Sequence, residues 1–278
     1  MKAALFLLAS IACTFSTLAQ KNDGKVVLTK GQKIIIKTSS TQDADMGMGM
    51  EMKNFSSSQN NLVVLDADDT SYSISNTLTG LKISMDMMGQ ATSYDSDKKE
   101  DSASEIGKSI PNLNIPDTVT MNKYSRAVYA RKKAEPVSTE DSNPLENMFE
   151  AFNNNKETTV SEAFFLIPKG KKVGDKWSDS SSTKDTRSYQ EYVLQSIDNG
   201  IATILENSKI ENNTQTEIQG MQVTVSMSAK STIEIKVDSK TGLVNKRETK
   251  TDLAGNLEMM GQSVPVTGKG TMTTTYEH

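Results

Sequence analysis

Residues 221–237 read MQVTVSMSAKSTIEIKV, an alternation of apolar and polar side chains that decides the fold class. The apolar positions are Met221, Val223, Val225, Met227, Ala229, Ile233, Ile235 and Val237. Successive side chains of a strand point to opposite faces, whereas a helix would scatter these residues around its axis. The stretch therefore predicts a β-strand with one buried face. A strand of this length is unusual, so we also expect a bulge or bend within it.

The stretches around this strand predict antiparallel partners. Residues 238–242 are of types that favour a turn, and a polar strand is expected at 243–252. Asn199-Gly200 separates apolar runs at 189–197 and 201–210, which is the strongest short-range signal for a β-hairpin. The last strand alternates as well, with Val264, Val266, Met272, Thr274 and Tyr276 on one face.

The N-terminal half has the same character. Strands are predicted at 34–38, 46–52, 62–65, 72–78 and 81–87, followed by a short hairpin over 119–121 and 124–130. Connecting turns are expected at 66–69 and at Thr79-Gly80. Helices are expected at 102–109 and 144–152, the latter because Asn143 can cap it and Pro144 suits its first position.

The sequence thus predicts a mainly β fold with two sequential antiparallel sheet or half-barrel units and one or two short helices. The expected boundaries are a signal peptide at 1–19, an N-terminal β unit at 20–133, a polar linker with a short helix at 134–156, and a C-terminal β unit at 157–278. Two pairs of similar segments suggest that the halves are related: 30–33 with 169–172, and 86–90 with 258–262.

The N-terminus predicts export. Lys2 precedes an apolar run, and Thr17-Leu18-Ala19 supplies a cleavage site, which together are typical of a secretory signal peptide. The expected location is the periplasm or the cell exterior. A minority alternative is a lipoprotein anchored through Cys13. No later apolar run is long enough for a transmembrane helix, and a net charge of -4 argues against nucleic acid as a partner.

Several segments together resemble a known family. They are Lys30-Gly31-Gln32, the Met-rich alternating strands, Tyr94-Asp95-Ser96, Phe165–Pro168 and Val173–Trp177. With the signal peptide, they are similar to a family of secreted β-rich proteins of unknown function that is common in Bacteroidetes-type bacteria. The resemblance implies export and a β fold, and it implies no catalytic or binding residue.

The residue types exclude several chemistries. His278 is the only histidine and Cys13 the only cysteine, so neither a Ser-His-Asp nor a Cys-His arrangement can form, and no histidine metal site can either. Asp66, Asp68 and Asp69 lack the glycine and glutamate spacing of a calcium loop, which favours a solvated turn. We therefore expect no cofactor, no metal and no catalytic residue.

Methionines form the most unusual local pattern. On a strand, the four methionines between 46 and 52 would share one face, which suggests either a soft-metal site or an adaptable apolar lining. We prefer the lining, which would surround a lipid or another apolar ligand. The proposed lining residues are Met46, Met48, Met50, Met52, Met85, Met87, Met221 and Met227.

Three hypotheses for function follow. The first is a non-enzymatic exported envelope protein that binds an apolar ligand or lipid in a Met-lined β cavity. The alternative is a structural or protein-interaction module with an envelope protein as partner and no small-molecule site. The third is a hydrolase that uses carboxylates, which would need two acids facing each other with at least one raised pKa.

Overall fold

The computed structural model describes residues 24–45, 47, 49–87, 89–103, 113–130, 156–218, 221–259 and 262–278. Several predicted features lie outside these residues, namely the signal peptide, Cys13, the helix predicted at 144–152 and the linker around that helix. Of the linker, only its last residue, Lys156, is described. The elements are β1 Lys33–Asp45, β2 Glu51–Ala67, β3 Ser71–Met87, β4 Gln90–Asp95, α1 Lys99–Ala103, β5 Asp117–Asn122, β6 Val128–Ala130, α4 Lys156–Glu162, β7 Lys176–Ser182, β8 Thr186–Asp198, β9 Ile201–Ile218, β10 Met221–Asp238, β11 Val244–Met259 and β12 Gln262–Glu277.

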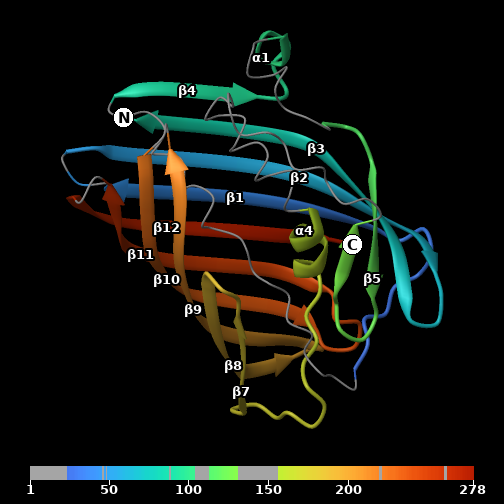
Figure 1. Cartoon of the computed structure of the whole chain (residues 1–278). Helices are drawn as coiled ribbons and strands as arrows, with labels where there is room; N and C mark the ends of the chain where they lie inside the picture. The colour runs from blue at the N-terminus through green and yellow to red at the C-terminus, as the bar shows by residue number, and fades with distance from the viewer. Residues whose placement is uncertain are drawn as a thin grey trace.

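The strands form one antiparallel sheet of twelve strands (Figure 1). The order is β6-β5-β3-β2-β1-β12-β11-β10-β9-β8-β7, and β4 pairs with the second part of β3. The prediction of a mainly β, antiparallel fold with short helices is confirmed. The N-terminal strands β1–β6 and the C-terminal strands β7–β12 occupy opposite sides of the sheet, and the β1–β12 pair joins them. The domain boundaries and the duplication stay predictions.

The C-terminal hairpins form where the sequence predicts them. Asn199 and Gly200 both have positive φ, 51° and 86°, as a two-residue turn between right-twisted strands requires. β10 runs through the alternating stretch, and its register with β11 shifts between Lys236 and Val237, which is the expected bulge. Polar residues at 243–252 begin β11, which continues to Met259.

Two local predictions in the N-terminal half are wrong. Thr79-Gly80 is not a turn, because β3 continues through it and its pairing with β2 shifts there instead. A glycine inside a strand suits such a bulge. The stretch 46–52 is not one strand either. Gly47 and Gly49 have φ of 69° and 74°, and the Met50 amide donates to the Gly47 carbonyl at 3.0 Å, so this stretch turns between β1 and β2.

The main core lies between the sheet and α4, which Figure 1 shows against one face of the sheet. We call this face the inner face. Phe164 and Phe165, just after α4, are 0% and 2% exposed and contribute the largest fully buried side chains. They pack with residues from both sides of the sheet, such as Ile36 on β1 and Ile235 on β10. Burial of this apolar surface is the dominant stabilising contribution to the fold.

Candidate functional site

The inner face carries a second apolar cluster that is separate from the main core. This far cluster consists of Val223, Val225, Met227, Ala229, Leu253, Leu257 and Val266. Its place follows from the alternation in β10: residues 223–229 belong to the far cluster, whereas Ile233, Ile235 and Val237 on the same face belong to the main core. One strand face therefore serves two apolar clusters.

A polar belt separates the far cluster from the main core. The belt consists of the inner-face residues Thr38, Ser40, Ser56, Ser208, Ser231, Thr249, Thr251 and Thr274. Hydroxyl groups pair across adjacent strands, at 3.2 Å for Thr38–Thr274, 2.7 Å for Ser40–Ser56 and 2.8 Å for Ser231–Thr251. Buried hydroxyl groups cost free energy unless they are hydrogen-bonded, and these pairs provide that compensation.

The predicted methionine lining is only partly brought together. Met227 belongs to the far cluster, and Met50 and Met87 pack against it while remaining half-buried. Met52 and Met85 are buried beside Ala44 in a small neighbouring cluster. Met46 and Met48 lie outside the described residues, and only the backbone of Met221 is described. Five of the eight methionines thus lie at the same end of the inner face, remote from α4.

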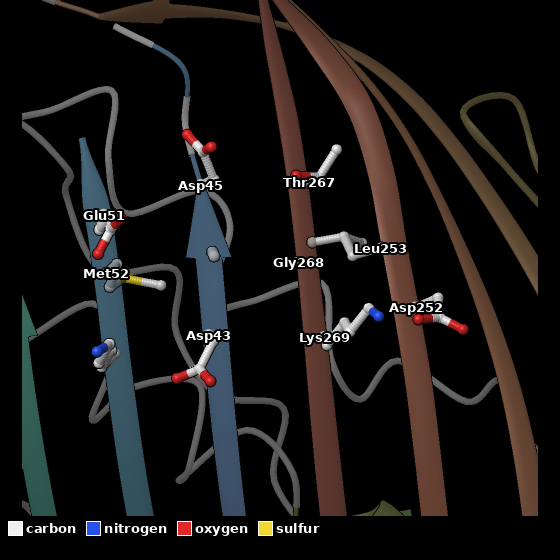
Figure 2. Close-up of a pocket in the computed structure, with 11 residues that line it drawn as sticks. Asp43, Asp45, Glu51, Met52, Asp252, Leu253, Thr267, Gly268 and Lys269 are labelled. Atoms are coloured by element: carbon white, nitrogen blue, oxygen red, sulfur yellow. The ribbon is translucent and has the colours of Figure 1, made fainter. Parts of the chain in front are cut away.

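A pocket of about 430 Å³ lies across the junction of the two groups of strands. Figure 2 shows its residues on four adjacent strands, β2, β1, β12 and β11. Ala44, Met52 and Leu253 are only 5%, 3% and 8% exposed, whereas the polar residues of the lining are exposed. Because these two sets alternate along each strand, the exposed polar residues of the lining lie on the outer face. Leu253 is a member of the far cluster, so the pocket borders on that cluster.

Charges of opposite sign face one another across this pocket. Asp43 is in register with Lys53 on β2 and with Lys269 on β12, and Lys269 is in register with Asp252 on β11. Opposite charges directly across an antiparallel pair favour one register over its neighbours, although exposed pairs contribute little to stability. The charged lining is therefore explained by strand pairing, and among the described residues no group of acidic, histidine or cysteine side chains could hold a metal ion.

A cluster of buried charges lies on the inner face where the main core meets the polar belt. It contains Arg126 from the β5–β6 turn, Glu162 at the end of α4, Glu206 on β9 and Arg247 on β11. Arg247 Nη1 lies 3.9 Å from Glu162 Oε1, and Arg126 Nη1 donates to the Phe164 carbonyl at 2.7 Å. Sequence reasoning missed this cluster, because its members are isolated charges in four distant segments.

Burial dominates the electrostatics of this cluster. Desolvation raises the pKa of Glu206 and that of Glu162, although the neighbouring guanidinium groups oppose the shift. Desolvation also lowers the pKa of Arg126 to about 10, which leaves this side chain protonated at neutral pH. The raised pKa values meet one condition that the hydrolase hypothesis sets. Glu206 is only 4% exposed, however, so it does not face an open cleft.

Aromatic rings cover one side of the charged cluster. Tyr192 stacks on Trp177, with ring centroids 5.5 Å apart and planes 16° apart, and it contacts the Phe165 ring at 5.6 Å. Trp177 lies at the start of β7, just after a turn. It is the only tryptophan of the chain, so its fluorescence is a specific reporter of this region.

The aspartates at 66–69 form the turn that the sequence predicts. Asp68 accepts hydrogen bonds from the Ser71 hydroxyl at 2.6 Å and from the amides of Thr70 and Ser71 at 2.8 and 2.7 Å, and these bonds lower the pKa of Asp68 to about 2. Asp66 pairs with Lys30 at 3.2 Å. Asp68 therefore has its partners within the turn, whereas the partner of Asp66 lies outside it.

Across the part of the chain that the structure describes, no helix has the length and hydropathy needed to cross a membrane.

Comparison with solved structures shows a likeness of fold. Lipovitellin, in a structure titled for its lipid–protein interactions, matches with a TM-score of 0.52 and 8% identity over 91% of this chain. The chain spans only 26% of the lipovitellin chain. DynF from the dynemicin pathway of Micromonospora chersina matches at 9% identity, over 95% of this chain and 90% of the DynF chain. An outer-membrane channel from Pseudomonas putida F1 matches at 8% identity, over 91% of this chain and 97% of the channel chain. Their TM-scores, 0.27 and 0.22, support no conclusion.

Comparison with sequences identifies the family. None of the curated proteins compared matches the chain. A family model described as a family of unknown function matches residues 69–244. This agrees with the resemblance to an uncharacterised family, while secretion and the bacterial group stay predictions. Because the match extends from β3 into β11 and covers more than half of the sequence, the chain belongs to the DUF6263 family of unknown function.

Proposed function

We propose that this protein is a non-enzymatic, exported envelope protein that binds an apolar molecule such as a lipid at the far cluster. The observation that carries the proposal is the presence of two apolar clusters on one sheet face, separated by a polar belt. The main core already includes α4 and strands from both sides of the sheet. The far cluster is thus a second apolar region, whose members are 0–8% exposed, and a ligand would enter it at its half-buried margin.

The methionines support this proposal. Met50 and Met87 are half-buried and pack at the margin of the far cluster, where a ligand would first make contact. Methionine side chains are unbranched and polarizable, so they can repack around apolar molecules of different shapes. The likeness of fold to lipovitellin, whose title names lipid–protein interactions, is in keeping with this function.

The test is a titration of the mature protein with N-phenylnaphthylamine, a dye that fluoresces in apolar surroundings. We expect saturable binding that Met50→Glu/Met87→Glu weakens at least tenfold, because a charge at the margin must be desolvated when the dye binds. Phe55→Glu is the matched control, since Phe55 is 40% exposed and its neighbours in β2, Asn54 and Ser56, point to the inner face. Equal loss in both variants, or no saturable binding to the wild-type protein, would refute the proposal.

The alternative function is a protein-interaction module, and the β7 edge favours it. β7 ends the sheet and pairs only with β8 among the described strands, so its other side can accept an added strand. The two functions differ in the surface that they use. Dye binding that persists when a partner peptide occupies β7 would separate them.

A further inference from the structure

Arg247, which is buried, and Arg126, which is half-buried, use only part of their hydrogen-bonding capacity. Arg247 is 8% exposed, and the Nε atoms of both arginines are buried without a hydrogen-bond partner. A guanidinium group carries five N–H donors, and a buried charge normally has them satisfied. The ion pair of Arg247 with Glu162 measures 3.9 Å, which is too long for a hydrogen bond.

The backbone shows that Arg126 is held in place at a conformational cost. Its φ is 56°, in the left-handed region that non-glycine residues seldom adopt, and its amide donates to the Asn122 carbonyl at 3.1 Å. This turn directs the guanidinium group onto the Phe165 ring, 5.2 Å from the ring centroid. A strained residue that its surroundings hold in place is a reason to look for a binding role.

The two arginines face two carboxyl groups, Glu162 and Glu206, and burial raises the pKa of both carboxyl groups. The ion pair of Arg247 with Glu162 is too long for a hydrogen bond, so it does not satisfy the donors of Arg247. The Nε–H groups of both arginines therefore stay without an acceptor in a buried setting, where a charge-assisted hydrogen bond to an anion is strong.

We propose that Arg126 and Arg247 together bind an oxyanion, a carboxylate or phosphate group, at the boundary between the main core and the polar belt. Two guanidinium groups suit such an anion because planar N–H pairs match its oxygens. The inference rests on the proposed function in one respect: the anion is the head group of an amphiphile whose apolar chain extends along the inner face toward the far cluster. Arg247 and Leu253 lie on the same face of β11, six residues or about 20 Å apart.

Trp177 gives a direct readout of this site. It stacks on Tyr192, and the charges of Arg126 and Arg247 both act on the Tyr192 hydroxyl group. An anion bound between the arginines would alter the field at this ring pair. We therefore expect a saturable change in tryptophan emission when decanoate is added to the full mature chain, and a different response to decanol, which has no charge.

The experiment compares three probes, namely decanoate, decanol and inorganic phosphate, against matched variants. Arg247→Met/Glu162→Gln removes the cation together with the carboxylate that forms an ion pair with it at 3.9 Å. Arg247→Lys keeps the charge and loses the planar donor pair. Arg187→Met is the control, because Arg187 is an exposed arginine on β8. Circular dichroism first establishes that each variant is folded.

We expect the dissociation constant for decanoate to rise at least tenfold in Arg247→Met/Glu162→Gln and severalfold in Arg247→Lys, with no change in Arg187→Met. Decanol affinity should stay the same in all variants. If the double variant does not fold, Arg247→Lys decides. Unchanged decanoate affinity in a folded Arg247 variant overturns the inference, and so does equal affinity of the wild-type protein for decanoate and decanol.

The phosphate arm distinguishes the two sources of the anion and separates the two proposals. Phosphate that competes with decanoate supports a site open to free anions, while decanoate binding without phosphate competition supports a head-group site. Phosphate binding without decanoate or dye binding would keep the anion site and reject the apolar ligand. Dye and decanol binding with no response to either anion would keep the apolar ligand and reject the anion site.

Discussion

Thr38 and Thr274 are joined by a hydrogen bond of 3.2 Å between their hydroxyl groups, although 236 residues separate them in the chain. The bond lies on the inner face, where β1 pairs with β12. Lys37 and Glu277 form an ion pair of 2.6 Å at the same junction. This junction makes one sheet of the two groups of strands, so both apolar clusters depend on it.

Disulfide formation can test the β1–β12 register. In the background Cys13→Ser, which leaves the chain without other cysteines, we expect Thr38→Cys/Thr274→Cys to form an intramolecular disulfide on mild oxidation. Directly opposed residues of an antiparallel pair have Cα atoms about 4.5–5.5 Å apart, within the range of a disulfide. Free thiols and gel mobility measure the product. Thr38→Cys/Thr273→Cys should stay reduced, because Thr273 points to the other face; equal cross-linking of both would contradict the register.

The stability of the protein should fall with rising pH because of Glu206. Burial raises the pKa of this carboxyl group above its ordinary value of 4.5. The folded protein then binds the proton more tightly than the unfolded protein, so the contribution to stability is full below the ordinary pKa and is lost as the pH rises through the folded pKa. Glu206→Gln keeps a neutral group of similar shape, so we expect it to remove this pH dependence.

The measurement for Glu206 is the free energy of unfolding in urea at about pH 4 and about pH 8. The free energy of unfolding of Glu206→Gln minus that of the wild-type protein should be larger at about pH 8 than at about pH 4. Glu51→Gln, at an exposed position on β2, serves as the control. A gain that is the same at both pH values would show that the proton on Glu206 is not responsible.

Any larger side chain at Gly255, which pairs with Met227 of the far cluster, should destabilise the protein. A Cβ atom built on it would meet the Ser226 carbonyl oxygen and would lie 2.5 Å from Met227 Sδ and 2.9 Å from Met227 Cα. We expect Gly255→Ala to lower the free energy of unfolding by about 1–3 kcal/mol, the usual cost of an overpacked core. Urea denaturation checks the change. Gly24→Ala, where no atom lies within 4 Å of the added Cβ, should change stability by less than about 0.5 kcal/mol.

In this chain, the alternation of apolar and polar residues predicts strands correctly where one face of the strand is exposed to solvent and a clear turn sequence adjoins it. The 221–237 alternation and Asn199-Gly200 meet both conditions, and β8, β9 and β10 form as predicted. The turn signal of Thr79-Gly80 failed because pairing with β2 continues on both sides of it, and a bulge absorbs the glycine. The strand expected at 46–52 failed because glycines at positive φ begin a new hairpin there.

The sequence by itself determined the class of fold, the short hairpins and the chemistries that are excluded, because each depends only on residue type and local spacing. Only the tertiary structure decided which strands are neighbours, how one strand face is divided between two apolar clusters, and that Arg126 lies near Arg247. The physical reason is that alternation fixes the face on which a side chain lies and leaves its cross-strand neighbour open. That neighbour is set by pairings such as β1 with β12, which form between segments at opposite ends of the chain.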